Sequence, residues 1–426
     1  MITRRDFLKS STTAAVGGML ASSLLSRAAG EAGSDRVLKV GLIGCGGRGS
    51  GAAGQALMAD PNVRLTAMGD AFADHLDSSL AILRKKWPDR IDVTPQTSFV
   101  GLDAYQKVID SGVDVVLLAA PPAFRPEHLR ASVAAGKHIF CEKPVAVDSA
   151  GIRSVFATVA EAKRKKISLV SGFCWRYDDR MRASVKQVHE GAIGTVRAIY
   201  ATYHTNTLTT KFPGTREAGW SDLEWQLRNW YNFTWLGGDH YVEQAIHNVD
   251  KIAWLMNGEL PVQAIGVGGR QSPAYGNTFD HYSVGYEYAS GARAQLSARQ
   301  CDGAYNEVTD YVIGTEGVFS NGRGMTQGIT GKNTWKYSNP VTRSMYDIEH
   351  QELFASIRSG NPINDGVSMT NSTLMGIMGR LAAYTGQTVS WEQALNSTES
   401  LMPAKLDWQM PLAVAPRAIP GHTKLV

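Results

Sequence analysis

The sequence predicts an α/β protein of two domains: an N-terminal Rossmann domain on a doubly wound parallel sheet, and a C-terminal α+β domain with an open, mostly antiparallel sheet. Short apolar runs alternate with helical stretches over residues 36–160, and continuous apolar strands are typical of parallel sheets buried on both faces. Beyond residue 161, strand-like segments alternate apolar and polar residues and end in Gly or Asn turns, which favours antiparallel pairing. A chain of 426 residues is long enough for both domains.

The first 30 residues have the pattern of a twin-arginine export signal. A Thr-Arg-Arg-Asp-Phe-Leu-Lys box at 3–9 precedes an apolar stretch at 12–25, and small residues follow. The stretch is too short and too rich in Gly and Ala for a bilayer span, which needs about 20 apolar residues. We therefore predict an exported, periplasmic protein that engages the twin-arginine export machinery. An uncleaved membrane anchor and an ordinary amphipathic helix are the alternatives.

Composition argues against two other classes of protein. The formal net charge of +4 falls to about +1 without residues 1–28, because that segment holds four Lys or Arg and one Asp, a difference of +3. Nothing in this balance indicates a nucleic-acid-binding surface. The four cysteines form no CxxC motif and have no regular spacing, so we expect small buried residues rather than a disulfide framework.

A glycine-rich turn follows the first predicted strand. The run LKVGLI precedes GCGGRG at residues 44–49, and a helical stretch and a second strand, VRLTAMGD, come next. In this context Gly44 allows a tight turn, Gly46 lets the backbone approach a pyrophosphate, and Gly49 lets the helix pack closely on the strand. The helix would offer its free N–H groups and positive dipole end to the phosphates. The pattern predicts a dinucleotide site.

The acid that ends the second strand bears on the choice of dinucleotide. Asp70 is placed to accept hydrogen bonds from the adenosine ribose and to repel a 2′-phosphate, which favours NAD. Arg48, beside the turn, keeps NADP as the alternative. The residues expected to bind the cofactor are Gly44, Gly46, Gly47, Arg48, Gly49, Asp70, Pro121, His128, Glu142 and Lys143.

The strand–helix alternation continues to a pair of charged residues. VDVVLLAAPP (113–122) predicts a buried strand, a helix follows to Gly136, and KHIFC (137–141) predicts the next strand. Ligands of such sheets bind beyond the carboxyl ends of the strands, where Glu142 and Lys143 follow KHIFC. Charges are costly to bury, so we interpret the pair as part of a nicotinamide site. A structural salt bridge within the pair is the alternative.

One segment of the second half, residues 229–258, carries several polar side chains. After Gly237-Gly238 the sequence predicts a helix with one polar face, formed by Asp239 or His240, Glu243, His247 and Asp250. Such a face suits acid–base chemistry, a metal site or solvent. A metal ion needs convergent ligands, and the sequence has neither a His-Glu-x-x-His motif nor a cysteine near this face, so we expect no metal.

Aromatic residues gather in the same part of the sequence, namely Trp225, Trp230, Tyr231, Trp235 and Tyr241. The apolar face of a pyranose stacks on such rings, so we predict a pocket for a carbohydrate. The residues expected to bind this substrate are Trp175, Arg176, Trp230, Asp239 and His240.

Together these features resemble the glucose–fructose oxidoreductase/inositol dehydrogenase (Gfo/Idh/MocA) family. The features are the glycine turn, Asp70, the run CEKPVAVD at 141–148, and the Gly-Gly…Glu243-x-x-x-His247-x-x-Asp250 helix. The resemblance covers nearly all of the chain after the signal. It implies a Rossmann domain followed by a sheet domain that binds substrate and mediates oligomerisation. We expect a homo-oligomer, a dimer or a tetramer.

The resemblance also implies roles for individual residues. Lys143 acts at the reacting hydroxyl and His247 acts as the acid–base group beside it; with Glu243 they form the expected catalytic group. The family commonly has Asp at the position of Glu243, which is one methylene longer, and Thr at the position of Ala120.

We therefore predict NAD(P)-dependent oxidation of a sugar or sugar-derivative hydroxyl, with hydride transfer to the nicotinamide and a proton relay through Lys143 and His247. Free NAD(P) is not expected to be plentiful outside the cytoplasmic membrane, so the cofactor should stay tightly bound and be regenerated in place. One alternative is a redox-neutral NAD-dependent glycosidase, lyase or epimerase acting through a keto-sugar. Another is a non-catalytic exported sugar- or nucleotide-binding protein. Related exported glycosidases lack the Glu-Lys-Pro lysine, whose presence here argues against them.

The expected segments of the chain are an export signal (1–30), the Rossmann domain (36–160), the substrate and oligomerisation domain (161–400) and a C-terminal arm lying over another surface (401–426).

Overall fold

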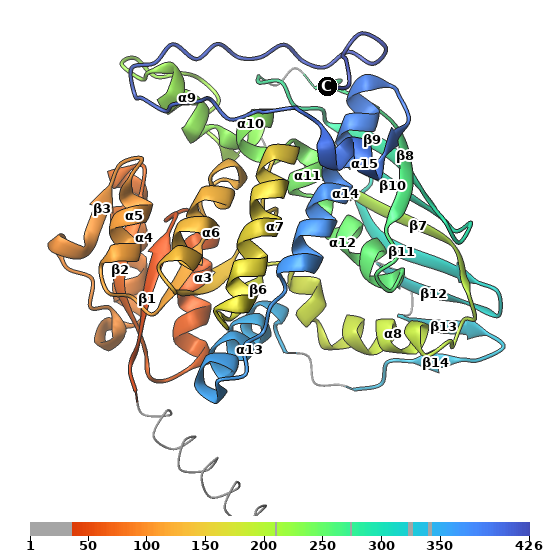
Figure 1. Ribbon diagram of the computed structural model, residues 1–426, viewed down its shortest axis with the longest axis horizontal. Coiled ribbons are helices and arrows are strands. Elements are labelled where there is room, and N and C mark those ends of the chain that lie inside the picture. The colour runs from red at the N-terminus through yellow and green to blue at the C-terminus, as the bar shows by residue number, and fades with distance from the viewer. Residues whose placement is uncertain (1–35, 209–210, 273–274, 323–326, 340–342) are drawn as a thin grey trace, which may run out of the picture.

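The computed structural model describes residues 36–208, 211–272, 275–322, 327–339 and 343–426 (Figure 1). The predicted export signal at residues 1–30 lies outside these ranges. Within them, no helix combines the length and the apolar character that crossing a membrane requires.

A six-stranded parallel sheet with helices on both faces forms the N-terminal half (Figure 1). Its strands, in spatial order, are β3 (Ser98–Val100), β2 (Val63–Asp70), β1 (Leu38–Ile43), β4 (Val115–Leu118), β5 (His138–Cys141) and β6 (Leu169–Ser171). The helices that connect them are α3 (Gly47–Ala59), α4 (Ala73–Lys86), α5 (Ala104–Asp110), α6 (Arg125–Ala134) and α7 (Ser149–Arg164). The order reverses between β1 and β4, which is the switch point of a doubly wound sheet. The predicted Rossmann domain is confirmed.

Two later segments also belong to this half of the molecule. We expected residues 167–176 in the second sheet, and this is wrong: β6 pairs with β5 in parallel, Ile139 beside Leu169. Helix α13 (Met345–Ser359) returns to pack on α3, and its Leu353 and Phe354 join the core around β1. Both are long-range pairings, which local sequence patterns do not determine.

The second half is a nine-stranded sheet covered by helices on one face (Figure 1). Its strands, in spatial order, are β14 (Trp335–Lys336), β13 (Gly328–Gly331), β12 (Gly317–Gly322), β11 (Glu307–Gly314), β7 (Val196–Thr205), β10 (Arg293–Gln300), β9 (His281–Tyr288), β8 (Pro261–Gly269) and β15 (Val389–Ser390). Neighbouring strands run antiparallel except for β7 and β10, which are parallel. The remaining α-helices are α8 (Asp179–His189), α9 (Asp222–Arg228), α10 (Thr234–Gly237), α11 (His240–Glu243), α12 (Ile246–Leu255), α14 (Gly366–Thr385) and α15 (Trp391–Asn396). The predicted open, mostly antiparallel sheet is confirmed.

The helix predicted to begin at Gly237-Gly238 is instead two short helices, α11 and α12, and the preceding α10 ends at Gly237. Gly238 has a φ of 80° and Asp239 a φ of 82°, a region that side chains disfavour, so the backbone turns sharply before α11. Gln244 and Ala245 then separate α11 from α12. Residues on either side of these breaks therefore do not share one helical face.

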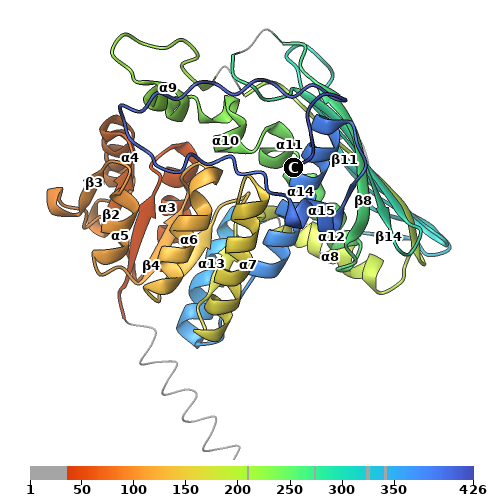
Figure 2. The same ribbon diagram turned by 45° about the horizontal axis from the view of Figure 1, so that its top comes forward.

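The C-terminal arm lies across the top of both halves in Figures 1 and 2. It runs from α15 to α9, where the backbone N–H of Leu412 donates to Asp222 (3.0 Å) and the Gln226 amide donates to the Leu412 carbonyl (2.7 Å). It then returns, and the carbonyl of Val426 accepts from the N–H of Thr398 (3.1 Å). The arm thus covers a surface of its own chain.

Candidate active site

A cleft of about 1660 Å³ lies between the two halves and takes residues from both. The N-terminal half contributes the glycine turn after β1 and the loops that follow β2, β4 and β5. The second half contributes residues of β7, α11 and α12 and the segment that follows α9. The carboxyl ends of the parallel strands open into this cleft, as ligand sites of such sheets do.

The glycine turn forms an open cradle at the N-terminus of α3. A Cβ on Gly44 (φ 94°) would lie 2.4 Å from the Ala120 nitrogen, and one on Gly49 would lie 1.9 Å from the Gly44 oxygen. Gly46 and Gly47 have no atom within 4 Å of the place a Cβ would take. Two glycines thus allow close packing and two leave space in front of the helix terminus, so the cradle fits the pyrophosphate of a dinucleotide.

Asp70 is fixed at the end of β2. One carboxylate oxygen accepts the N–H of Cys45 (2.6 Å), and the other accepts the N–H of Phe72 (2.9 Å). His75 Nδ1 lies 3.6 Å from the same carboxylate, and the interaction with Asp70 raises the pKa of His75. Asp70 lines the cleft, in the position from which it can also accept from the adenosine ribose.

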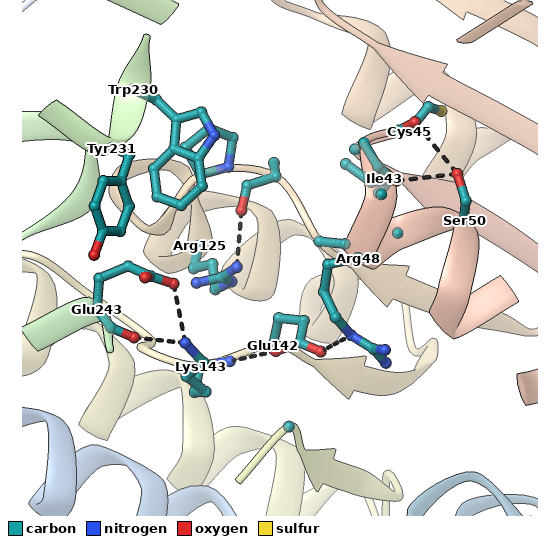
Figure 3. Close-up of a pocket in the computed structure, with 18 of the residues that line it drawn as sticks. Ile43, Cys45, Arg48, Ser50, Arg125, Glu142, Lys143, Trp230, Tyr231 and Glu243 are labelled. Atoms are coloured by element: carbon teal, nitrogen blue, oxygen red, sulfur yellow. Dashed lines mark hydrogen bonds and ion pairs between the residues drawn. The ribbon is translucent and has the colours of Figure 1, made fainter. Parts of the chain in front are cut away.

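Arg48 points away from the adenosine end of the cleft. Its Nε donates to Glu142 (Figure 3). Its guanidinium lies 3.7 Å from Glu349 and over the ring of Tyr346. The neighbouring Glu142 and Glu349 raise the pKa of this already basic group against the effect of burial. A guanidinium held in this way does not reach a ribose 2′-phosphate beside Asp70, which removes the argument that Arg48 favours NADP.

Glu142 and Lys143 do not form a side-chain pair with one another. Glu142 pairs with Arg48, whereas Lys143 Nζ donates to Glu243 Oε1 (2.9 Å) and to the Glu243 carbonyl (2.5 Å) (Figure 3). The exposed fraction is 9% for Lys143 and 7% for Glu243. The first charge pair therefore stays in the Rossmann half, and the second joins β5 to α11 across the cleft.

His247, near the start of α12, also lines the cleft. Burial lowers its pKa well below the usual value, and the charges of Lys143 and Lys251 lower it further. Its Nδ1 makes no hydrogen bond to any residue that the structure describes. His247 is therefore a neutral imidazole beside an ammonium group, an arrangement that can accept a proton from a ligand hydroxyl.

The other expected cofactor residues, Pro121 and His128, line the cleft as well. His128 stacks on Tyr105, with ring centroids 4.2 Å apart, and its burial lowers its pKa to about 3. It is therefore an uncharged part of the wall.

Six of the expected aromatic and substrate-binding residues are outside the wall of the cleft. Trp175, Trp230 and Tyr231 line it, but Arg176, Asp239, His240, Trp225, Trp235 and Tyr241 do not. Arg176 instead pairs with Asp250 (2.9 Å). Asp239 accepts from the Phe279 N–H (2.8 Å) and from the Tyr384 hydroxyl, and burial raises its pKa to about 6. The structure thus places Arg176, Asp239 and His240 outside the cleft wall. Asp239 and His240 lie there because the backbone turns at Gly238 and Asp239, and Arg176 because it pairs with Asp250.

Two buried cations in the wall, Arg125 and Lys251, were not identified from the sequence. Arg125 donates to the carbonyls of Ala120 (2.9 Å) and Pro144 (2.5 Å) and so joins the loops after β4 and β5. Lys251 is 1% exposed and pairs with Asp310. Its spacing of four residues from His247 is the one pattern that could have identified it. Among the described residues, no group of three or more His, Cys, Asp or Glu is arranged to hold a metal ion.

A parallel sheet with this glycine cradle, a fixed acid after β2 and a lysine–histidine pair at the far end defines a dinucleotide-dependent oxidoreductase. The chain matches the oxidoreductase family with an NAD-binding Rossmann fold over residues 38–170 and the GFO/IDH/MocA C-terminal domain over residues 181–320. It belongs to this family, and its cofactor is NAD.

Individual relatives are distant in sequence. The inositol 2-dehydrogenase of Rhizobium meliloti (strain 1021) is 24% identical over 323 residues, 75% of this chain and 86% of the relative. A levoglucosan dehydrogenase solved with NADH superposes with a TM-score of 0.66 at 20% identity, covering 83% of this chain and 98% of the other. The aldose–aldose oxidoreductase of Caulobacter crescentus superposes with a TM-score of 0.64 at 19% identity, covering 83% and 100%.

Proposed function

We propose that this protein is an exported NAD-dependent oxidoreductase that oxidises a hydroxyl of a sugar or polyol. The observation that carries the proposal is the placement of Lys143 and a neutral His247 in one cleft with the glycine cradle. Trp175, Trp230 and Tyr231 add the aromatic surface that a sugar ring needs. The relatives named inositol 2-dehydrogenase and levoglucosan dehydrogenase support a polyol or sugar as the substrate.

The chemistry follows from the two proton-handling groups. The hydroxyl to be oxidised lies between Lys143 and His247; the imidazole takes its proton, and the ammonium stabilises the negative charge that develops on the oxygen. Bound NAD supplies the acceptor for the hydride that leaves the same carbon. Glu243 holds Lys143 in place through two hydrogen bonds. In the reverse direction the protonated His247 returns the proton to a carbonyl oxygen.

Removal of either group tests this assignment. Lys143→Ala and His247→Ala should each lower kcat by about 10²–10⁴-fold, the usual contribution of general acid–base catalysis, while the fold is retained. NADH formation with a panel of myo-inositol, levoglucosan and D-glucose measures it. Near-normal turnover in either variant would exclude the role given to that residue.

The C-terminal arm supports a tightly held cofactor. Phe72 follows Asp70 and lines the adenosine end of the cleft. Trp408 of the arm packs on the Phe72 ring with centroids 5.7 Å apart, and the Arg228 guanidinium lies 3.9 Å from the centre of that ring. The arm and α9 thus brace the residue that borders the adenosine site. Mass analysis of nucleotide released from the denatured protein tests retention: NAD in a one-to-one ratio supports it, and an empty site opposes it.

A retained cofactor favours reactions that regenerate it in place. Oxidation of one sugar can be coupled to reduction of another, and the Caulobacter neighbour named aldose–aldose oxidoreductase supports this form. Transient oxidation of one molecule can also drive elimination or epimerisation through a keto-sugar. Incubation with one sugar and with pairs of sugars distinguishes the two, because only the paired reaction requires a second sugar.

Export and assembly complete the proposal. The Thr-Arg-Arg-Asp-Phe-Leu-Lys box supports carriage by the twin-arginine machinery to the periplasm, which fractionation of cells tests directly. The helix-free face of the nine-stranded sheet (Figure 1) exposes Tyr200, Ile265, Val267 and Tyr311, which supports a dimer or tetramer joined through this face. Val267→Lys should then give a smaller species in light scattering, and an unchanged mass would oppose it.

A further inference from the structure

Lys251 lies on α12 four residues after His247, a spacing that puts both side chains on one side of the helix. Like His247, it lines the cleft, although only 1% of it is exposed. Its Nζ lies 5.0 Å from the centre of the Trp175 ring, which lines the same part of the cleft. The charges of Lys143 and Lys251 both act on His247, so Lys251 borders the reacting centre.

The ammonium group of Lys251 has more hydrogen-bond donors than it has acceptors among the described residues. An ammonium carries three N–H donors and no acceptor. Among the described residues, Lys251 Nζ makes a single hydrogen bond, to Asp310 Oδ2. Two donors of a buried, charged group thus lack a protein acceptor, and buried donors in that state are costly. A ligand oxygen in the cleft would satisfy them.

The surroundings of Asp310 indicate what kind of oxygen this is. The Asp310 carboxylate neutralises Lys251 and also accepts from the side-chain amides of Asn248 (3.0 Å) and Asn321 (3.0 Å). Asp310 does not line the cleft, so the carboxylate is anchored behind the lysine. Because the buried pair has no net charge, it gives no strong attraction to a carboxylate or phosphate. A neutral hydroxyl or carbonyl oxygen matches the two remaining donors.

We propose that Lys251 binds a neutral oxygen of the sugar or polyol other than the reacting hydroxyl, and so determines which substrates are accepted. The inference rests on the proposed function and adds to it a specific contact: the substrate is an uncharged polyol, held at two oxygens along one side of α12. Lys143 and His247 take the reacting hydroxyl, and Lys251 takes the second.

The test compares variants on a deoxy series. Lys251→Met alone leaves a buried carboxylate unpaired, so it is compared with the double variant Lys251→Met/Asp310→Asn, which removes both charges and keeps one oxygen that can accept from Asn248 or Asn321. Lys332→Met, which removes an exposed ammonium paired with Glu316, is the matched control. The NADH-loaded proteins are titrated with the best substrate of the sugar panel and with each of its monodeoxy analogues, and tryptophan fluorescence reports binding.

We expect both Lys251 variants to bind the parent sugar about 10- to 100-fold more weakly than the wild type, as loss of a hydrogen bond from a charged group implies. One monodeoxy analogue, which lacks the hydroxyl that Lys251 contacts, should bind the variants and the wild type equally. Equal weakening for every sugar, or no weakening, overturns the proposal while leaving the proposed function intact. If the wild type itself transfers no hydride from any sugar of the panel, the proposed function fails and this inference fails with it.

Discussion

Glu243→Gln removes the negative charge beside Lys143 and leaves the shape of the side chain almost unchanged. In the native protein Lys143 Nζ is 2.9 Å from Glu243 Oε1 and 2.5 Å from the Glu243 carbonyl, and both side chains are buried. In the variant the carbonyl and the amide oxygen can still accept hydrogen bonds. What is lost is the charge that compensates a buried ammonium group.

The size of the loss follows from this geometry. Coulomb's law with an effective dielectric constant of about 20 gives about 6 kcal/mol for two unit charges separated by the Nζ–Oε1 distance. Breaking buried pairs typically costs about 3–5 kcal/mol, and the retained hydrogen bonds place this variant near the lower figure. Without this pair, Lys143 is also no longer held in its correct position relative to the substrate. A displacement of about 1 Å at a reacting centre can lower the rate by about 100-fold.

Urea unfolding and steady-state kinetics measure the two effects. We expect the free energy of unfolding to fall by about 3 kcal/mol and kcat to fall by about 100-fold. Glu243→Asp keeps the charge and should be intermediate in both. Glu316→Gln, which breaks the exposed pair with Lys332, is the control and should change stability by less than about 1 kcal/mol. A Glu243→Gln enzyme with unchanged stability and unchanged kcat would refute the claim that this pair positions Lys143.

Three further outcomes are expected. Burial and two lysines hold the pKa of His247 well below its usual value. We therefore expect kcat/KM to be constant across neutral pH and to fall only in acid, where the imidazole becomes protonated. A fall centred near pH 7 would contradict this. Trp408→Ala should release the cofactor about 2- to 10-fold faster, since an aromatic pair contributes about 0.5–1.5 kcal/mol. Stopped flow measures this rate, and an unchanged rate would show that the arm has no part in retention of the cofactor. Gly49→Ala should abolish NAD binding in calorimetry because its Cβ would overlap the Gly44 oxygen, whereas tight binding would show that the turn can open.

The Rossmann half could be predicted because its signals are local. The apolar runs of β1, β4 and β5 are almost fully buried, and the cradle of Gly44–Gly49 follows β1 directly. The position of β6 in this sheet could not be predicted, because a three-residue apolar strand is compatible with either sheet. The return of α13 to α3 depends on contacts between residues far apart in the sequence.

The candidate site also contains residues that local sequence patterns could predict and residues that they could not. Lys143 and His247 were identified by residue type and by position after a strand or on a helix, and both line the cleft. Asp239 was misplaced because helical spacing assumes an unbroken helix, and its own positive φ breaks the helix. The orientation of Arg48 depends on Glu142, which the sequence places on a different strand end, and the burial of Lys251 depends on Asp310 in β11.

The most direct test of the central claim is the transfer of a labelled hydride. The purified protein with NAD is incubated with myo-inositol, levoglucosan and D-glucose deuterated at their carbon positions, then denatured, and the nicotinamide is analysed by mass. We predict deuterium on the nicotinamide with at least one sugar, and labelling that is slower by about 10²–10⁴-fold with the Lys143→Ala variant. An unlabelled nicotinamide in the wild-type protein would contradict the claim that this cleft oxidises a sugar or polyol hydroxyl.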